Sequence, residues 1–163
     1  MPDLPLDFSA SYSLAYQAAI VAHLRSSAKI AVGLDVLGKV EGSLETRIDE
    51  ALAGAVGATI FVSPPLPGGI SPDVSAIVFD RFDFVVRIIQ DTTTDDSGKT
   101  AHLLMEIVLA RLHHFTPRDI PGAGVITADP DPVDARATTK KRIILDLGFS
   151  GAGSFGLDES LGD

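Results

Sequence analysis

The segment from Ser97 to Thr100, with the sequence Ser-Gly-Lys-Thr, ends like the phosphate-binding loop of nucleotide hydrolases. That loop, G-x-x-x-x-G-K-[ST], needs a first glycine five residues before Gly98, so that backbone N–H groups can curl around the phosphates. Thr93 stands at that position, and the acidic pair Asp95–Asp96 that follows would repel a triphosphate at short range. We therefore expect no nucleotide site here, and we predict instead that Ser97 caps a helix whose positive end faces the two acids.

Two further patterns imitate enzyme motifs without completing them. The run from Ile143 to Asp146 imitates the apolar strand and aspartate that hold magnesium in nucleotide hydrolases, but little sequence follows it to complete that fold. Ser150 is the serine nearest to a G-x-S-x-G pattern, and no helix is expected directly after it, as a nucleophile elbow requires. The sequence therefore predicts no serine nucleophile.

The histidines do not form a metal-binding pattern. His102 and Glu106 lie one helical turn apart and could share a metal ion, but the H-E-x-x-H pattern is missing and no third ligand is near in sequence. His113 and His114 fall in the last turn of a predicted helix, where the helix dipole favours a cation and free carbonyls accept hydrogen bonds. We interpret them as helix-end residues.

Paired carboxylates are the remaining candidates for acid and base chemistry. Asp80 with Asp83, and Asp129 with Asp131, have suitable spacing. They stand at strand ends and in proline-rich turns, where aspartate is common because it bonds its own backbone. The sequence therefore predicts no catalytic, cofactor-binding or metal-binding residue, no cofactor, and a protein that is not an enzyme.

Composition narrows the function classes further. The 163 residues are 45% hydrophobic and 21% charged, which is typical of one globular domain. Cysteine is absent, which excludes disulfides, thiol catalysis and cysteine-bound metals. The net charge of -9, with no basic cluster larger than Lys140 to Arg142, argues against a domain that binds nucleic acid. Apolar runs fall short of the roughly 20 residues that cross a bilayer, and the acidic N-terminus is unlike a signal peptide, so we expect a cytoplasmic location.

Hydrophobic periodicity predicts three helices, five extended segments and an α+β fold class. Consecutive strands joined by turns favour a mixed, mainly antiparallel sheet with two or three helices packed on one face. A proline-rich loop from 63 to 69 is expected to stop one strand. The helices are expected at 13–26, 43–54 and 99–114, and the extended segments at 28–40, 58–62, 75–90, 125–127 and 141–149.

The segment from Arg81 to Ile88 alternates between apolar and mostly charged residues. All even-numbered residues there are apolar, and the odd-numbered residues are mostly charged. A strand with one buried face requires this pattern. One face is therefore expected to join the core, and the other to be exposed or paired with a partner.

This order of elements resembles the small structural proteins that finish bacteriophage tails: the tail terminator and tail-completion group, and related prophage tail components. The resemblance covers roughly residues 13 to 150 and is a pattern of elements. In that group a leucine-histidine pair, an aromatic residue and a proline often close the last helix, as Leu112 to Pro117 do here. The other segments that carry it are the first helix, the strand 60–62 with the prolines 64–65, the strand 82–88 and the strand 143–147.

The resemblance implies a structural subunit without catalysis, built on an α+β domain that assembles as a ring, commonly a hexamer. Its implied partners are copies of itself and neighbouring tail tube or head-connector proteins, with no specific binding to nucleic acid and no membrane. The implied location is the host cytoplasm during assembly and then the virion tail. Subunit contacts in a ring are heterologous, so two different faces of each subunit must be complementary.

A candidate assembly surface follows from the apolar loop and the charged strand face. We expect an N-terminal arm at 1–12, one tail-terminator-like domain at 13–150, and a glycine-rich acidic tail at 151–163. The candidate surface residues are Pro64, Pro65, Leu66, Pro67, Arg81, Asp83 and Arg87.

Two alternatives stay open at this point. One is an intracellular ligand-binding or small enzymatic α+β domain with a pocket between the sheet and the third helix, near His102, Arg111 and Asp83. The other is an adaptor or secretion-apparatus subunit with the same fold. A ligand site needs polar groups that converge in a concave apolar pocket, whereas an assembly subunit needs patches that are shared with its neighbours.

Overall fold

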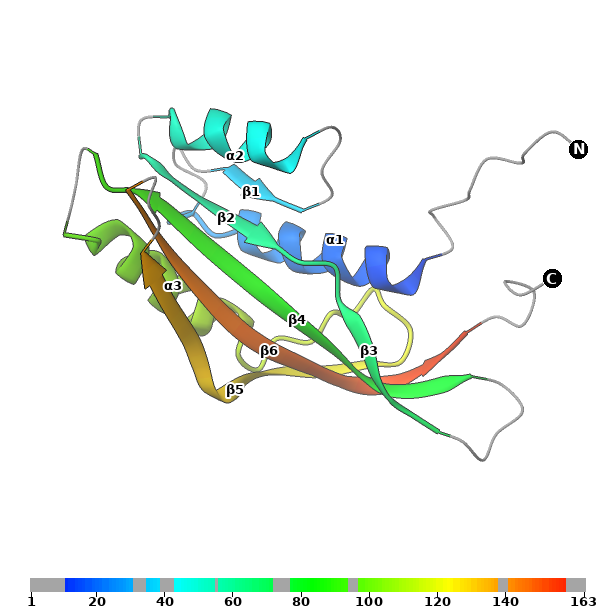
Figure 1. The fold of residues 1–163 in the computed structure, drawn as a ribbon. Helices are drawn as coiled ribbons and strands as arrows, with labels where there is room; N and C mark the ends of the chain where they lie inside the picture. Colours follow the sequence, from blue (N-terminus) through cyan, green and yellow to red (C-terminus); the bar gives the residue numbers. More distant parts are fainter. Residues whose placement is uncertain are drawn as a thin grey trace, which may run out of the picture.

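The computed structural model describes residues 11–30, 35–38, 43–54, 56–71, 77–93, 97–137 and 141–157. These residues form an α+β fold in which helices pack against a mixed, mainly antiparallel sheet (Figure 1), as the sequence predicts. No helix in these ranges has the length and apolar character that a bilayer-crossing segment needs.

The helices are α1 (Tyr12–Arg25), α2 (Leu44–Leu52) and α3 (Lys99–Leu112), which confirms the three predicted helices. Serine side chains cap the first two. The Ser11 hydroxyl accepts a hydrogen bond from the Leu14 N–H at 3.2 Å, and the Ser43 hydroxyl accepts one from Thr46 at 3.4 Å.

The start of α3 differs from the prediction. Its N-cap is Gly98, in the left-handed region at φ +70, and not Ser97. Ser97, one residue earlier, still accepts a long hydrogen bond from the Lys99 N–H, at 3.4 Å. The Ala101 N–H in the first turn donates instead to the side-chain oxygen of Gln90, at 2.9 Å, and Gln90 is only 2% exposed. The pair Asp95–Asp96, expected at the same helix end, lies outside the described residues.

The sheet is centred on one long strand, β4 (Val78–Asp91). On one side β4 pairs antiparallel with β2 (Ala58–Val62), and on the other with β6 (Arg142–Gly156). The outer strands are β1 (Asp35–Leu37), parallel to β2, and β5 (Ala123–Ala137), antiparallel to β6. The order is thus β1-β2-β4-β6-β5.

An additional strand, β3 (Leu66–Ile70), occupies the segment that the sequence predicts to be a loop. It pairs antiparallel with the first half of β4, on the side where β2 pairs with the second half. Pro64 and Pro65, which lie between β2 and β3, interrupt the pairing with β4 because proline has no N–H to donate. The proline-rich segment therefore interrupts the strand, but it does not end pairing with β4.

The last two strands are longer than predicted. The sequence predicts β5 only at 125–127, and it predicts that β6 ends at 149, with a glycine-rich acidic tail from 151. Prolines and glycines act as strand breakers locally, but here pairing along the partner strand overrides them. Pro130 and Pro132 fall in an irregularity of register between Ala128 and Val133, on a strand whose other edge pairs with no described strand.

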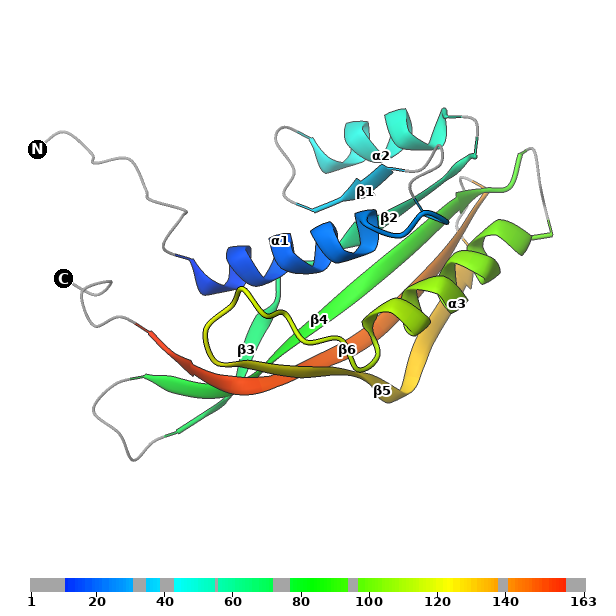
Figure 2. The ribbon, with the colours of Figure 1, turned by 180° about the vertical axis from the view of Figure 1, so that it is seen from behind.

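The core lies between one face of the sheet and the helices α1 and α3, which cover the same face (Figures 1 and 2). α2 lies at the β1 edge. The even positions of β4 from Phe82 to Ile88 point into this core together with aromatic side chains of β6 and α1, as the alternation predicts. The fully buried aromatic residues at its centre are Tyr16, Phe82, Phe149 and Phe155.

Candidate assembly surface

The opposite face of β4 and β6 presents the odd positions of β4 from Arg81 to Arg87. α2 reaches this side at the start of β6, where Asp49 pairs with Arg142. The cross-strand pairs of this face are set by register. Asp83 lies opposite Ser150, Val85 opposite Gly148, and Arg87 opposite Asp146. We call this surface the open face. It is where the alternating strand places its charged side, as the sequence predicts.

An ion cluster occupies one end of the open face. The Arg87 guanidinium donates two hydrogen bonds to the Asp146 carboxylate, at 2.7 and 2.9 Å, and Arg136 on β5 approaches the same carboxylate at 3.3 Å. The hydrogen bonding with Asp146 raises the pKa of Arg87 above its ordinary value. In the sequence, Asp146 resembled a magnesium-binding aspartate. In the structure, its carboxylate oxygens accept hydrogen bonds from Arg87 and Arg136.

A shallow hollow of about 220 Å³ lies further along the open face, where β3, β4, β5 and β6 meet. Its apolar walls include Pro64, Leu66 and Val85, and the Leu66 side chain is 69% exposed. Two carboxylates, those of Asp83 and Asp129, also line it. We call this feature the acidic hollow.

The two carboxylates of the acidic hollow share one donor. The Ser150 hydroxyl lies 2.8 Å from Asp83 and 3.3 Å from Asp129. A serine hydroxyl has one hydrogen to donate, so the shorter contact with Asp83 is the stronger bond. Asp83 also pairs with Arg81 at 3.2 Å, whereas no basic side chain of the described ranges pairs with Asp129.

Gly148 makes room for the Asp129 carboxylate. A Cβ at position 148 would lie 2.2 Å from an Asp129 side-chain oxygen, closer than any real contact. The register irregularity of β5 between Ala128 and Val133 brings Asp129 over β6 at this point. The glycine and the irregularity together place the Asp129 carboxylate, which has one long hydrogen bond to Ser150, beside the apolar side chains of the hollow.

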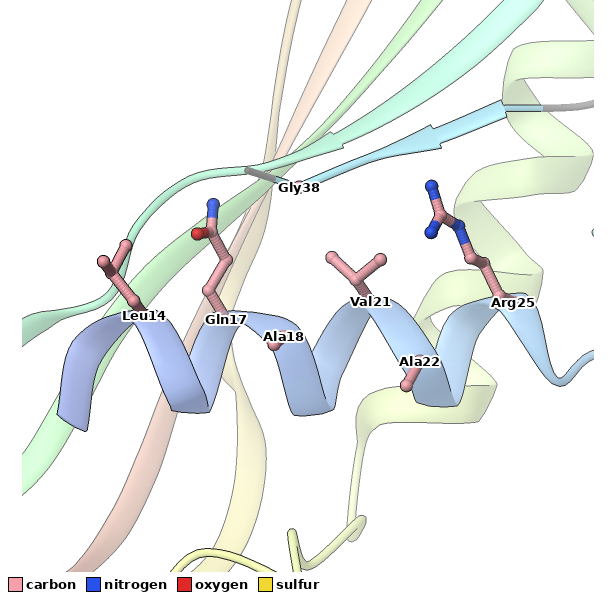
Figure 3. A pocket seen from close by; sticks show the side chains of 7 residues that line it. All are labelled: Leu14, Gln17, Ala18, Val21, Ala22, Arg25 and Gly38. Atoms are coloured by element: carbon pink, nitrogen blue, oxygen red, sulfur yellow. The ribbon is translucent and has the colours of Figure 1, made fainter. Parts of the chain in front are cut away.

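A second hollow, of about 380 Å³, runs along α1 beside Gly38 at the end of β1 (Figure 3). Gln17, Val21 and Arg25 point from α1 toward β1. Gln17 donates to the Val62 carbonyl at 2.8 Å, and Arg25 donates to the Val36 carbonyl at 2.6 Å. Because Gln17 and Arg25 hydrogen-bond carbonyls of β2 and β1, the side chains that line this hollow hold α1 against the edge of the sheet.

The structure brings some of the predicted surface residues together and separates others. Pro64, Leu66 and Asp83 line the acidic hollow, Arg81 pairs with Asp83, and Pro67 is exposed on β3. Pro65 is buried, and its carbonyl accepts a hydrogen bond from Ser13 on α1. Arg87 belongs to the ion cluster. Sequence reasoning missed Ser150 and Gly148 as surface residues and took Asp129 for a turn residue, because only strand register and a bulge place them here.

The residues of the alternative ligand pocket do not converge. His102 is exposed on α3, and Asp83 lies on the open face, on the other side of the sheet. Arg111 donates from the end of α3 to the His23 carbonyl of α1 at 2.7 Å. Between α3 and the sheet, the apolar side chains Leu104 and Val108 join the core.

The remaining histidines have structural partners. The His23 ring donates from Nε2 to the Arg111 carbonyl at 3.0 Å and stacks on Phe115, with ring centroids 3.6 Å apart. The His113 ring nitrogen accepts the Ala128 N–H of β5 at 3.1 Å, a different partner from the helix carbonyls that were expected. Within the described residues, no group of three or more possible ligands is placed to hold a metal ion.

No protein-family model matches the chain, and a search of curated proteins found no match. Among solved structures, the chain is similar to one from a structure described as the virion of a native gene transfer agent particle. The TM-score is 0.59 at 20% sequence identity, and the match covers 89% of this chain and 100% of that chain. The two chains therefore share a fold over nearly their whole length.

Proposed function

We propose that this protein is a structural subunit of a phage-like tail, a tail terminator or completion protein that works by ring-type self-assembly. The observation that carries the proposal is the fold shared end to end with a chain of a gene transfer agent virion. The match spans the whole of that chain, so the likeness is not confined to one motif.

The arrangement of polar groups supports a role without catalysis. The carboxylates and arginines of the open face form ion pairs with one another or lie on a shallow, open surface. A catalytic site instead gathers polar groups in a concave pocket. Shape and charge at the surface are therefore the properties that this chain offers to a partner.

The partners proposed are copies of the chain itself and neighbouring tail tube or head-connector proteins. The net charge of -9 suits a ring through which DNA passes, because acidic walls repel the duplex. We propose the same three parts of the chain, an arm at 1–12, one α+β domain from 13 and an acidic C-terminal segment. Because β6 continues to Gly156, we place the end of the domain there and not at 150.

Native mass spectrometry and sedimentation velocity, across a hundredfold concentration range, test the proposal. We expect a closed assembly of about five to seven copies, visible as rings in negative stain. A chain that stays monomeric at every concentration, alone and with tail tube protein, contradicts ring assembly. Fluorescence anisotropy with duplex DNA at low salt is a second test, in which we expect no saturable binding.

A further inference from the structure

We propose that the acidic hollow receives the outer surface of α3 from a second copy of this chain, with Lys99 entering beside Asp129 and Leu103 packing on Leu66 and Val85. This inference rests on the proposed self-assembly and names the two surfaces that meet in it.

The hollow offers an unusual combination of apolar wall and under-bonded charge. Leu66 is 69% exposed and Val85 is 38% exposed, so two apolar side chains face solvent beside the carboxylates. Among the described residues, Asp129 has only the long 3.3 Å contact with Ser150, whose hydrogen is directed to Asp83. A complementary surface must therefore present one apolar side chain and one cation a few ångströms apart.

The outer surface of α3 has that composition. Leu103 is 58% exposed, and Lys99 is exposed one helical turn before it, so the two lie side by side on the helix surface. Among the described acidic side chains, none is in ion-pair distance of Lys99. Leu104 and Val108 face the sheet, which directs Lys99 and Leu103 away from it.

The two surfaces lie on opposite sides of one molecule. α3 covers the core face of the sheet (Figures 1 and 2). The acidic hollow lies on the open face. A subunit cannot satisfy its own hollow with its own helix, so the contact must pass to the next copy. Such a heterologous contact repeats from copy to copy, and it closes into a ring when the rotation between copies permits.

Charge reversal tests the pairing. Lys99→Glu and Asp129→Lys should each lower the assembly constant at least tenfold, and the double variant should recover most of it. Glu50→Lys, on exposed α2, is the matched control and should leave assembly unchanged. Circular dichroism verifies that each variant is folded, and Lys99→Glu, on a solvent-exposed helix position, keeps the test decisive should Asp129→Lys unfold.

Cross-linking in a chain without cysteine tests the contact directly. The pair Lys99→Cys with Asp129→Cys should oxidise to a ladder of covalent oligomers, whereas each single variant can form dimers at most. Glu50→Cys with Asp129→Cys is the control pair. A 99/129 pair that cross-links no better than this control overturns the contact. Rings that form and withstand both reversals overturn it while leaving the proposed function intact, and a strict monomer overturns both.

Discussion

The hydroxyl of Tyr16 on α1 occupies the space where residue 151 on β6 would carry a side chain. A Cβ on Gly151 would lie 1.8 Å from the Tyr16 hydroxyl oxygen and 2.8 Å from the ring carbon that bears it. Tyr16 is fully buried, and burial raises the pKa of its hydroxyl. The glycine therefore permits the close approach of Tyr16 to β6.

Gly151→Ala should lower the free energy of unfolding by about 3 kcal/mol, the upper part of the range for overpacked cores. Urea denaturation measures the change, with Gly156→Ala as the matched control. Gly156 lies on the same strand, and a methyl group there would meet no atom within 4 Å, so its substitution should have little effect. If both substitutions lowered the free energy of unfolding equally, strand propensity and not the Tyr16 contact would explain the loss at Gly151.

Tyr16→Phe should raise the free energy of unfolding by about 1 kcal/mol. The buried hydroxyl has no hydrogen-bond partner among the described residues, so its removal ends a desolvation cost without breaking a bond. The same change should also recover part of the stability lost in Gly151→Ala. A double-mutant cycle between the two positions measures that coupling, and simple additivity would argue against the contact.

Gln90→Leu should destabilise the protein by about 1–3 kcal/mol, because the Ala101 N–H at the start of α3 loses its buried acceptor. Ser97→Ala, at the exposed side of the same helix end, should cost at most about 0.5 kcal/mol. Hydrogen exchange localises the effect: the first turn of α3 should exchange faster in Gln90→Leu. Unchanged exchange there would mean that Gln90 does not hold the helix start.

The contribution of His23 to stability should depend on pH. Burial lowers the pKa of His23, the hydrogen bond with the Arg111 carbonyl partly opposes this, and the Arg111 charge adds to the lowering. The unfolded chain then takes up the proton first as pH falls. The contribution is complete above about pH 6.5, the ordinary value for histidine, and is lost at lower pH.

Urea denaturation at pH 7.5 and pH 5.5 measures this dependence. His23→Gln should be less stable than the wild type at pH 7.5 but should lose less on acidification. His102→Gln, at an exposed position of α3, should keep the wild-type dependence on pH. An identical loss in His23→Gln and the wild type would assign the dependence to other groups.

Asp146→Asn should lower the free energy of unfolding by about 1–2 kcal/mol, since it weakens two charge-assisted bonds from Arg87, itself partly exposed. Arg136→Ala removes only the single 3.3 Å contact and should cost about 0.5 kcal/mol or less. Thermal unfolding at low and high salt checks both. If Arg136→Ala lost more stability than Asp146→Asn, Arg136 and not Arg87 would be the main partner of Asp146.

Local sequence was sufficient where an element's signals lie within it. The serines before α1 and α2 and the β-branched run of β2 are such signals, and the ranges predicted for these three elements agree with the structure. The alternation around Asp83 also predicted which side of β4 is buried. These patterns depend on neighbours a few residues apart, which a sequence displays directly.

Sequence was insufficient where distant strands decide the outcome. β3 and the ends of β5 and β6 form against proline and glycine signals because the long β4 and its neighbours supply partners. The cap from Gln90 to α3 and the approach of Asp129 to Ser150 likewise join separate elements. Single-residue propensities contain no information on strand register, so the acidic hollow could not be foreseen.

The outer edge of β5 bears on how copies of this chain can meet. Pro130 and Pro132 have no amide hydrogen, and the aspartates at 129, 131 and 134 place negative charge along the same border. Strand-by-strand growth into a continuous intermolecular sheet is therefore blocked along this border. Copies that meet at this border therefore join through side chains and not through a shared sheet.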